Sequence, residues 1–115
     1  MGAAPVRRLN DLYFGPSAEE KRKEILNALE EGRPLPALYL ITFASNSTDQ
    51  LDILPSYMLR LKSVRKRLPL LAGAAFGRQE ALELVGRIAS EAYKQTGACM
   101  LQSFLLRRDA GELSR

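Results

Sequence analysis

The chain has 115 residues with a formal net charge of +4, and 46% of them are hydrophobic and 26% charged. This length lies within the usual range of one domain, about 50–200 residues, and the composition excludes a disordered polypeptide. The absence of His and the presence of a single Cys exclude histidine-based catalysis, histidine metal sites, an intrachain disulfide and a cysteine zinc cluster within one chain.

The first predicted helix follows a start, residues 1–10, that we expect to be flexible. Ser17 and Glu20 have the spacing of a capping box, which satisfies free amides at a helix N-terminus. Apolar residues then recur with helical spacing from Ala18 to Glu31, and Gly32 is typical of a left-handed position after a helix end. The pattern therefore predicts a helix over 18–31.

Two apolar runs predict buried strands. Leu38–Ala44 and Pro69–Phe76 are apolar on both alternating faces, as in a strand covered on both sides of a sheet. Gly73, inside the second run, predicts a bulge or the close approach of another backbone. Leu12–Phe14 is predicted as a short strand or an extended arm, and Cys99–Leu106 as a third strand or a short helix.

Two further helices are predicted after these runs. Pro55 suits the first turn of a helix that we place over Pro55–Lys66. Its expected inward residues are Tyr57, Met58, Leu61 and Val64. The clearest helical periodicity covers Arg78–Thr96, and Gly97 is expected to end that helix in the left-handed region. Within it, Glu83 and Arg87 are spaced for an i,i+4 ion pair.

This order of elements predicts a small single α/β domain over residues 11–106, with a frayed tail over 107–115. The expected sheet is short and mostly parallel, with about three strands and three helices, because strands that alternate with helices form βαβ units. Three strands are few for such a sheet. We therefore expect that two copies pair as a homodimer across an open sheet edge.

Polar residues follow both buried runs and define a candidate ligand site. In parallel sheets, ligands bind outside the carboxyl ends of the strands, so the two loops would be neighbours if their strands are adjacent. Short polar groups, a glycine at a helix start and an arginine suit a phosphate or a carboxylate. Capping and turn formation explain the same residues without a ligand. The candidate ligand-binding residues are Asn46, Ser47, Thr48, Asp49, Gly77 and Arg78.

The positive charge is concentrated in one segment. Tyr57–Arg67 contains five cations and no acid, which leaves a net charge of −1 for the rest of the chain. Such a segment can contact a nucleic-acid backbone, although no aromatic residue interleaves with the cations to stack on bases. The alternative is a solvated helix end whose cations favour the helix dipole. The candidate nucleic-acid-binding residues are Arg60, Lys62, Arg65, Lys66 and Arg67.

Few residues are suited to catalysis. The spacing of Gly73 and Gly77 fits neither a dinucleotide fingerprint nor a P-loop. Asp49 and Asp52 are three apart, so a helix would place both carboxylates on one face, but such a pair is common. Cys99, in an apolar run, is expected to be a small buried residue without a redox role. We expect no catalytic residue, no metal and no cofactor, and we identify no diagnostic family signature.

Localisation follows from the same features. The chain does not open with a secretory signal pattern, and its longest apolar run, Pro69–Phe76, is far shorter than the ~20 residues of a membrane span. We therefore expect a cytoplasmic protein without membrane contact. The leading functional hypothesis is a small non-enzymatic interaction or regulatory module with a protein partner, including itself. The alternatives are an anion-binding or small-ligand-binding protein, which could be an enzyme, and a less favoured nucleic-acid binder.

Overall fold

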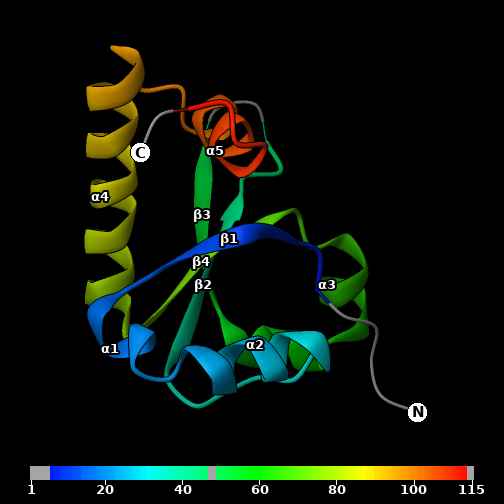
Figure 1. The fold of residues 1–115 in the computed structure, drawn as a ribbon. Helices are drawn as coiled ribbons and strands as arrows, with labels where there is room; N and C mark the ends of the chain where they lie inside the picture. Colours follow the sequence, from blue (N-terminus) through cyan, green and yellow to red (C-terminus); the bar gives the residue numbers. More distant parts are fainter. Residues whose placement is uncertain (1–5, 47–48, 114–115) are drawn as a thin grey trace.

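The structure of the protein is a computed structural model that describes residues 6–46 and 49–113 (Figure 1). The elements follow one another as β1 (Arg8–Phe14), α1 (Pro16–Glu19), α2 (Arg22–Glu30), β2 (Leu38–Phe43), β3 (Leu51–Pro55), the 3₁₀-helix η1 (Ser56–Arg60), α3 (Lys62–Arg67), β4 (Leu71–Phe76), α4 (Arg78–Thr96) and α5 (Leu101–Asp109). No helix within these two ranges is both long and apolar enough to cross a membrane.

The four strands of the described chain form one mixed sheet in the order β1-β4-β2-β3. β1 pairs with β4 in parallel, whereas β2 pairs antiparallel with both β4 and β3. The prediction of an α/β fold is confirmed. The expectation of about three mostly parallel strands is wrong, because one further strand is present and two of the three pairings are antiparallel. The expectation of three helices is also wrong, because the described chain has five α-helices and one 3₁₀-helix.

The missed strand, β3, follows from the turn that precedes it. The amide of Ala44 donates to the carbonyl of Gln50 at 3.0 Å, and the amide of Asp49 donates to Asn46 Oδ1 at 2.7 Å. The polar loop after β2 is therefore a hairpin loop, so the chain returns beside β2 instead of crossing over it. All five residues of β3 are half-buried, including Asp52 between two apolar neighbours.

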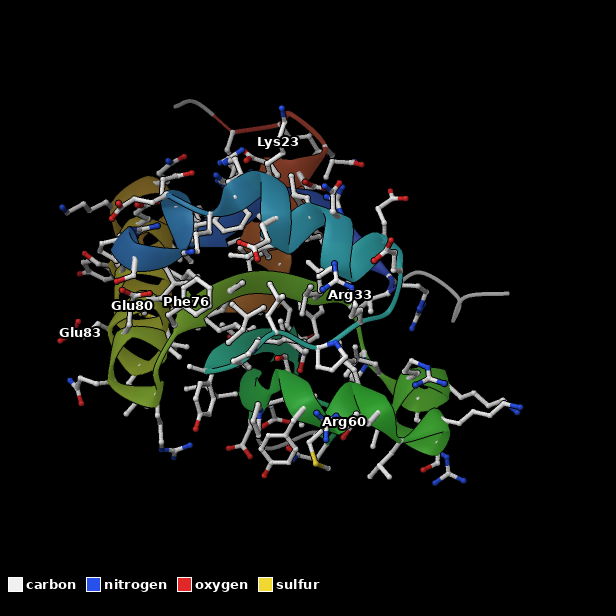
Figure 2. The ribbon with its side chains drawn as sticks, turned by 90° about the horizontal axis from the view of Figure 1, so that it is seen from below. Lys23, Arg33, Arg60, Phe76, Glu80 and Glu83 are labelled. Atoms are coloured by element: carbon white, nitrogen blue, oxygen red, sulfur yellow. The ribbon has the colours of Figure 1, made fainter. Side chains whose placement is uncertain are left out.

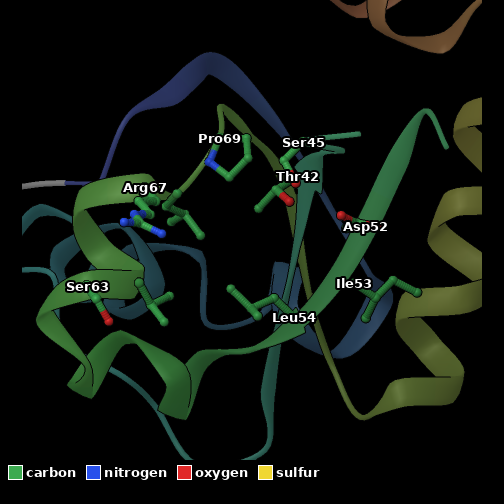
Figure 3. A pocket seen from close by; sticks show the side chains of 10 residues that line it. Thr42, Ser45, Asp52, Ile53, Leu54, Ser63, Arg67 and Pro69 are labelled. Carbon is green, nitrogen blue, oxygen red and sulfur yellow. The ribbon is translucent and has the colours of Figure 1, made fainter. Parts of the chain in front are cut away.

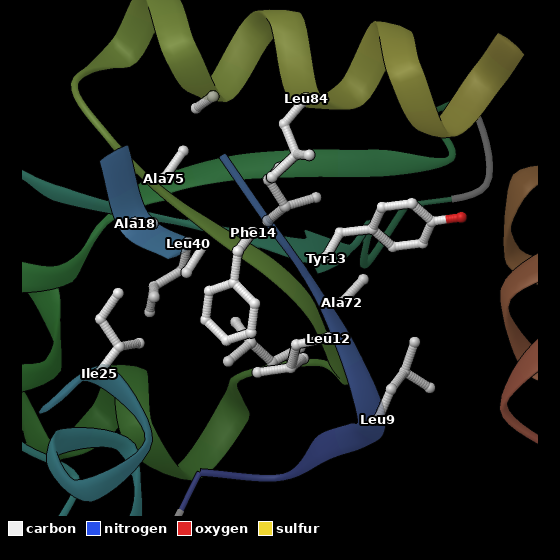
Figure 4. Packing of buried hydrophobic residues seen from close by; sticks show 14 of the residues in the cluster. Leu9, Leu12, Tyr13, Phe14, Ala18, Ile25, Leu40, Ala72, Ala75 and Leu84 are labelled. Atoms are coloured by element: carbon white, nitrogen blue, oxygen red, sulfur yellow. The ribbon is translucent and has the colours of Figure 1, made fainter. Parts of the chain in front are cut away.

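Helices cover both faces of the sheet. α4 lies along one face, and α2 and α3 lie on the other (Figure 1). Figure 4 shows the strands between Leu84 of α4 and Ile25 of α2, and both of these side chains are buried. Leu71–Ala75 of β4 are buried throughout, as expected for a central strand with both faces covered.

The first predicted helix is divided into α1 and α2. α1 begins at Pro16, directly after Gly15, and the expected capping box of Ser17 with Glu20 is not formed. The amide of Ser17 instead donates to Glu80 Oε1 at 3.0 Å, a carboxylate 63 positions away. A tertiary contact therefore satisfies the helix N-terminus for which we predicted a local partner.

Both predicted glycine helix ends are confirmed. Gly32 has a φ of 64° after α2, and Gly97 has a φ of 76° after α4. The amide of Arg33 donates to the carbonyl of Ala28 at 2.8 Å, which is the long hydrogen bond of a Schellman motif. Glycine adopts this left-handed conformation without the steric cost of a Cβ atom.

The single helix predicted over Pro55–Lys66 is wrong in its start and its continuity. Its first residue belongs to β3, and the helical part is interrupted at Leu61, whose ψ of 118° is extended. The interruption changes which side chains face inward. Tyr57 and Leu61 were expected inside but are 62% and 51% exposed, whereas Leu59 is fully buried.

The structural role predicted for Gly73 is confirmed. A Cβ atom at this position would lie 2.9 Å from the carbonyl oxygen of Tyr13, on the neighbouring strand. The register between β2 and β4 shifts between Ile41 and Thr42, which pair with Gly73 and Leu71. Both observations mark the close approach and irregularity that a strand glycine predicts.

The two ends of the described chain contact each other. β1 starts at Arg8, inside the segment 1–10 that we expected to be flexible. Residues 99–106, predicted as strand or short helix, contribute to α5, which continues to Asp109, past the predicted domain boundary at residue 106. The Asp109 carboxylate accepts the amides of Asn10 and Asp11 at 3.0 and 2.9 Å and so joins α5 to β1.

Candidate functional site

The two loops of the predicted ligand site lie at opposite ends of the sheet. Asn46 and Asp49 follow β2, and Gly77 and Arg78 follow β4. Because β2 and β4 are antiparallel, their carboxyl ends point in opposite directions. The expectation that the loops are neighbours is therefore wrong, and they do not form one site. The remaining candidates, Ser47 and Thr48, lie outside the described residues.

Each loop has its own surroundings. Asn46 and Asp49 are hydrogen-bonded to each other and border a hollow of about 430 Å³ together with Met100, Gln102 and Ser103 near the start of α5. The amide of Gly77 donates to the carbonyl of Ala37 at 2.9 Å. That amide is thus occupied within the chain, while Arg78 is exposed.

The five cations of the basic segment lie on η1 and α3, and together these residues are called here the basic surface. Its residues are Arg60, Lys62, Arg65, Lys66 and Arg67. Within residues 6–46 and 49–113, none of them forms an ion pair. Arg65 donates through Nη1 to the carbonyl of Leu59, and the other four are exposed. Figure 2 places Arg60 on the side of the molecule opposite Lys23 of α2.

Two apolar side chains accompany the basic surface. Tyr57 and Leu61, on either side of Arg60, are among the most exposed large apolar residues of the described chain. Near Tyr57, a second hollow of about 270 Å³ is lined by Tyr39, Arg60 and prolines that include Pro55. The surface therefore presents unpaired cations beside accessible apolar groups.

A cavity of about 380 Å³ opens between β3 and α3 and is called here the β3–α3 cavity (Figure 3). Its lining residues are Thr42, Ser45, Asp52, Ile53, Leu54, Ser63, Val64, Arg67, Leu68 and Pro69. This volume lies in the range of small-molecule sites, about 300–1,000 Å³. The cavity combines an apolar lining with hydroxyls, one carboxylate and one guanidinium.

The two charges of the cavity come from different walls. Asp52 is the antiparallel partner of Thr42, so the two side chains lie on the same face of the sheet. Arg67 and Ser63 are four residues apart on α3 and hence neighbours on that helix. Figure 3 shows Arg67 and Asp52 on opposite sides of Leu54, and they form no ion pair.

A second polar cluster surrounds Tyr13 on β1. Its hydroxyl donates to Glu91 Oε1 at 2.6 Å, and the guanidinium carbons of Arg108 and Arg87 lie 4.3 and 5.5 Å from the ring centroid. Burial and the hydrogen bond to Glu91 raise the pKa of Tyr13 well above its usual value. The phenol stays protonated near neutral pH and serves as a structural donor. Arg87 lies 4.0 Å from Glu91, rather than pairing with Glu83 as predicted.

The carboxylate of Glu80 connects three segments of the chain. It accepts the amide of Phe76 at 2.8 Å and that of Ser17 at 3.0 Å. Burial by itself raises the pKa of Glu80, but hydrogen bonds from these two residues and from Ala18 outweigh it and lower that pKa. All of these hydrogen-bond donors are groups of the protein itself that Glu80 joins across separate segments, so we assign Glu80 a structural role.

The described residues do not assemble a metal or carboxylate site. No group of three or more His, Cys, Asp or Glu within the described ranges is placed to hold a metal ion. Asp49 lies in the hairpin loop and Asp52 in β3, so the helix that would have placed both carboxylates on one face is not formed. Cys99, expected to be buried, is exposed between α4 and α5, and its carbonyl accepts from Gln50 Nε2 at 2.9 Å.

The sequence prediction missed four polar residues of the β3–α3 cavity. Asp52 was considered only with Asp49, and Thr42, Ser45 and Ser63 were not among the candidate site residues. One signal was available for Thr42, because it is the polar member of an otherwise apolar strand. For the cavity itself no signal existed, because its walls come from strands and a helix whose pairing the sequence did not reveal.

Comparison with known proteins identified no relative of this chain. The chain matches no protein-family model. It likewise matches no curated protein and no solved structure, so the site rests on its own geometry.

Proposed function

We propose that the protein is a small non-enzymatic interaction module that contacts an acidic partner protein through the basic surface. The observation that carries this proposal is that five cations of η1 and α3 have no ion-pair partner among the described residues. Elsewhere in the described chain, Arg33 and Arg108 are paired with carboxylates, whereas Lys23 and Arg78 form no ion pair. The segment 60–67 is distinguished by its five cations without an acid. Unpaired cations on one segment supply the charge complementarity that steers association with an acidic surface.

The apolar neighbours of these cations favour a protein over a polynucleotide. Tyr57 and Leu61 are exposed beside Arg60. Tyrosine and arginine are enriched at protein interfaces, where an aromatic or aliphatic anchor is surrounded by polar groups. A polynucleotide surface would instead combine the cations with a series of stacking aromatic residues. Tyr57 is the only aromatic residue between Pro55 and Leu68.

The proposal can be tested with fluorescent poly-glutamate as an acidic polypeptide probe. We expect saturable binding in an anisotropy titration, weakened by added salt because exposed charges are screened. The triple variant Arg60→Gln, Lys62→Gln, Lys66→Gln should bind at least tenfold more weakly. These three residues are exposed and lie outside the β3–α3 cavity.

A matched control separates the basic surface from net charge. The triple variant Lys21→Gln, Lys23→Gln, Lys94→Gln removes the same charge from exposed positions outside η1 and α3. It should retain nearly all of the binding. An equal loss in both variants, or no binding to the wild-type protein, would contradict a localised interaction surface.

Nucleic acid remains the second candidate, because the same unpaired cations suit a phosphate backbone. The distinguishing measurement is a titration with a single-stranded homopolymeric oligonucleotide at the same ionic strength. Tighter binding of the oligonucleotide than of poly-glutamate, lost in the Arg60, Lys62, Lys66 variant, would assign the surface to nucleic acid. We expect the opposite order of affinities.

A further inference from the structure

We infer that the β3–α3 cavity binds a small zwitterion, a molecule whose ammonium and carboxylate groups are separated by a short aliphatic stretch. The inference shares Arg67 with the basic surface but does not need the acidic partner proposed for that surface. It rests on the placement of Asp52 and Arg67 in one cavity of about 380 Å³ without an ion pair between them.

The acceptor side of the cavity is built by the β2–β3 hairpin. Asp52 and Thr42 are register partners, and Ser45 lies just beyond the end of β2. Thr42 is only 3% exposed and is packed within the sheet, whereas Ser45 is exposed. A carboxylate with two neighbouring hydroxyls suits an ammonium group, which offers three hydrogen-bond donors.

The donor side is built by α3. Arg67 lies one turn from Ser63 on this helix, and it has no acidic partner among the described residues. A guanidinium binds a carboxylate through two parallel hydrogen bonds, which fixes the orientation as well as the charge of the ligand.

The lining between the two sides is apolar. In Figure 3, Leu54 of β3 lies between Asp52 and Arg67. The other apolar lining residues include Val64, Leu68 and Pro69. Apolar lining with a few placed polar groups is the usual composition of a small-molecule site. It suits methylene groups between the two charged ends of a ligand.

The charges also act against other classes of ligand. A simple anion would face the Asp52 carboxylate, and a simple cation would face the Arg67 guanidinium. Repulsion from a protein group of the same charge weakens ligand binding. Only a ligand with both a positive and a negative group can therefore interact favourably with both Asp52 and Arg67. The cavity therefore selects zwitterions over singly charged analogues.

The test is a calorimetric titration with ω-amino acids of increasing length, from glycine to 6-aminohexanoate. We expect saturable binding that is strongest at one length. The amine and the carboxylic acid of that same length should each bind at least tenfold more weakly. No saturable binding across the series, or equal binding of the carboxylate-only analogue, would overturn the inference.

Three variants locate the binding in the cavity. Asp52→Asn should remove the preference over the carboxylate-only analogue, and Arg67→Gln should remove the preference over the amine. Arg60→Gln, on the basic surface but outside the β3–α3 cavity, should bind like the wild type. An equal loss in Arg60→Gln would reveal general electrostatic attraction and overturn the site. The titrations of the wild-type protein can by themselves reject the inference, so the test does not depend on whether any variant folds.

Discussion

At the residue scale, Glu80 shows how one side chain holds distant segments together. Its carboxylate accepts amides from Ser17 at the start of α1 and from Phe76 at the end of β4. Figure 2 shows Glu80 near Phe76, whereas Glu83 of the same helix points outward. Sequence periodicity places both acids on the polar side of α4, so only the three-dimensional contacts distinguish them.

The first prediction concerns the pH dependence of this contact. The pKa of Glu80 is lower in the folded protein than the ordinary value of 4.5. Its stabilising contribution is therefore present above pH 4.5 and is lost as the pH falls through the lowered pKa. Glu80→Gln should reduce the free energy of unfolding at neutral pH. We expect a reduction of about 1 kcal/mol, which is the typical effect of removing a side chain that caps a helix N-terminus.

Urea unfolding from neutral pH to well below 4.5 measures this effect. The difference between wild type and Glu80→Gln should shrink as the pH falls, because the wild-type carboxyl becomes protonated. Glu83→Gln is the control, since Glu83 is exposed and bonds only to Gln79 among the described residues. A constant difference at all pH values would contradict the assigned role.

At the scale of elements, α5 is attached to β1 by polar contacts at its C-terminal end. Asp109 accepts the amides of Asn10 and Asp11, and Arg108 forms a 3.0 Å ion pair with Asp11. Strand edges with free amides are sites of unwanted pairing, and an acceptor that occupies them blocks that pairing. α5 thus covers one edge of the sheet, which explains why this helix continues past residue 106 to Asp109.

Asp109→Ala should reduce the free energy of unfolding by about 1–3 kcal/mol, because two strand amides lose a charged acceptor. Chemical denaturation measures this, and hydrogen exchange at Asn10 and Asp11 should accelerate. Glu112→Ala removes an exposed carboxylate 3.9 Å from Arg107 and should change stability by less than about 0.5 kcal/mol. Equal effects of the two substitutions would show that Asp109 does not anchor α5.

At the scale of the whole molecule, the two edges of the sheet differ. The amide of Phe43 donates to Leu70 beside β4, while that of Ala44 donates to Gln50 on the other side of β2. In an antiparallel pair, only every second residue exchanges hydrogen bonds with the partner strand. Ile53 of β3 is one of the residues that do not, so its amide points away from β2. No strand of the described chain pairs with this outer side of β3. The homodimer expected from the sequence would form here.

Light scattering during size-exclusion chromatography tests this arrangement. We expect a dimer whose population rises with protein concentration. Ile53→Pro should shift it to monomer, because proline lacks the outward amide, whereas Ile53→Val keeps that amide and should dimerise. Far-UV circular dichroism must show that both variants are folded. A wild-type monomer at every concentration would contradict edge pairing.

The features predicted correctly depend on contacts close in sequence. α4 covers Arg78–Thr96 as predicted, and Gly32 and Gly97 end their helices in the left-handed conformation. Helical periodicity and the lack of a Cβ atom act within a few residues, so the sequence alone specifies them. β3 was missed because the same five residues can begin a helix or pair as a strand, and the choice depends on the neighbouring β2.

The sequence by itself determined the α/β class, the two buried strand segments, the principal helix and the concentration of positive charge in one segment. Only the tertiary structure decided the antiparallel pairing of β2, which separates the two predicted loops and brings Asp52 and Arg67 to one cavity. The physical reason is range. Periodicity, capping and turn preferences act between near neighbours, whereas strand pairing and cavity formation depend on residues far apart in the chain, whose contacts leave no local pattern.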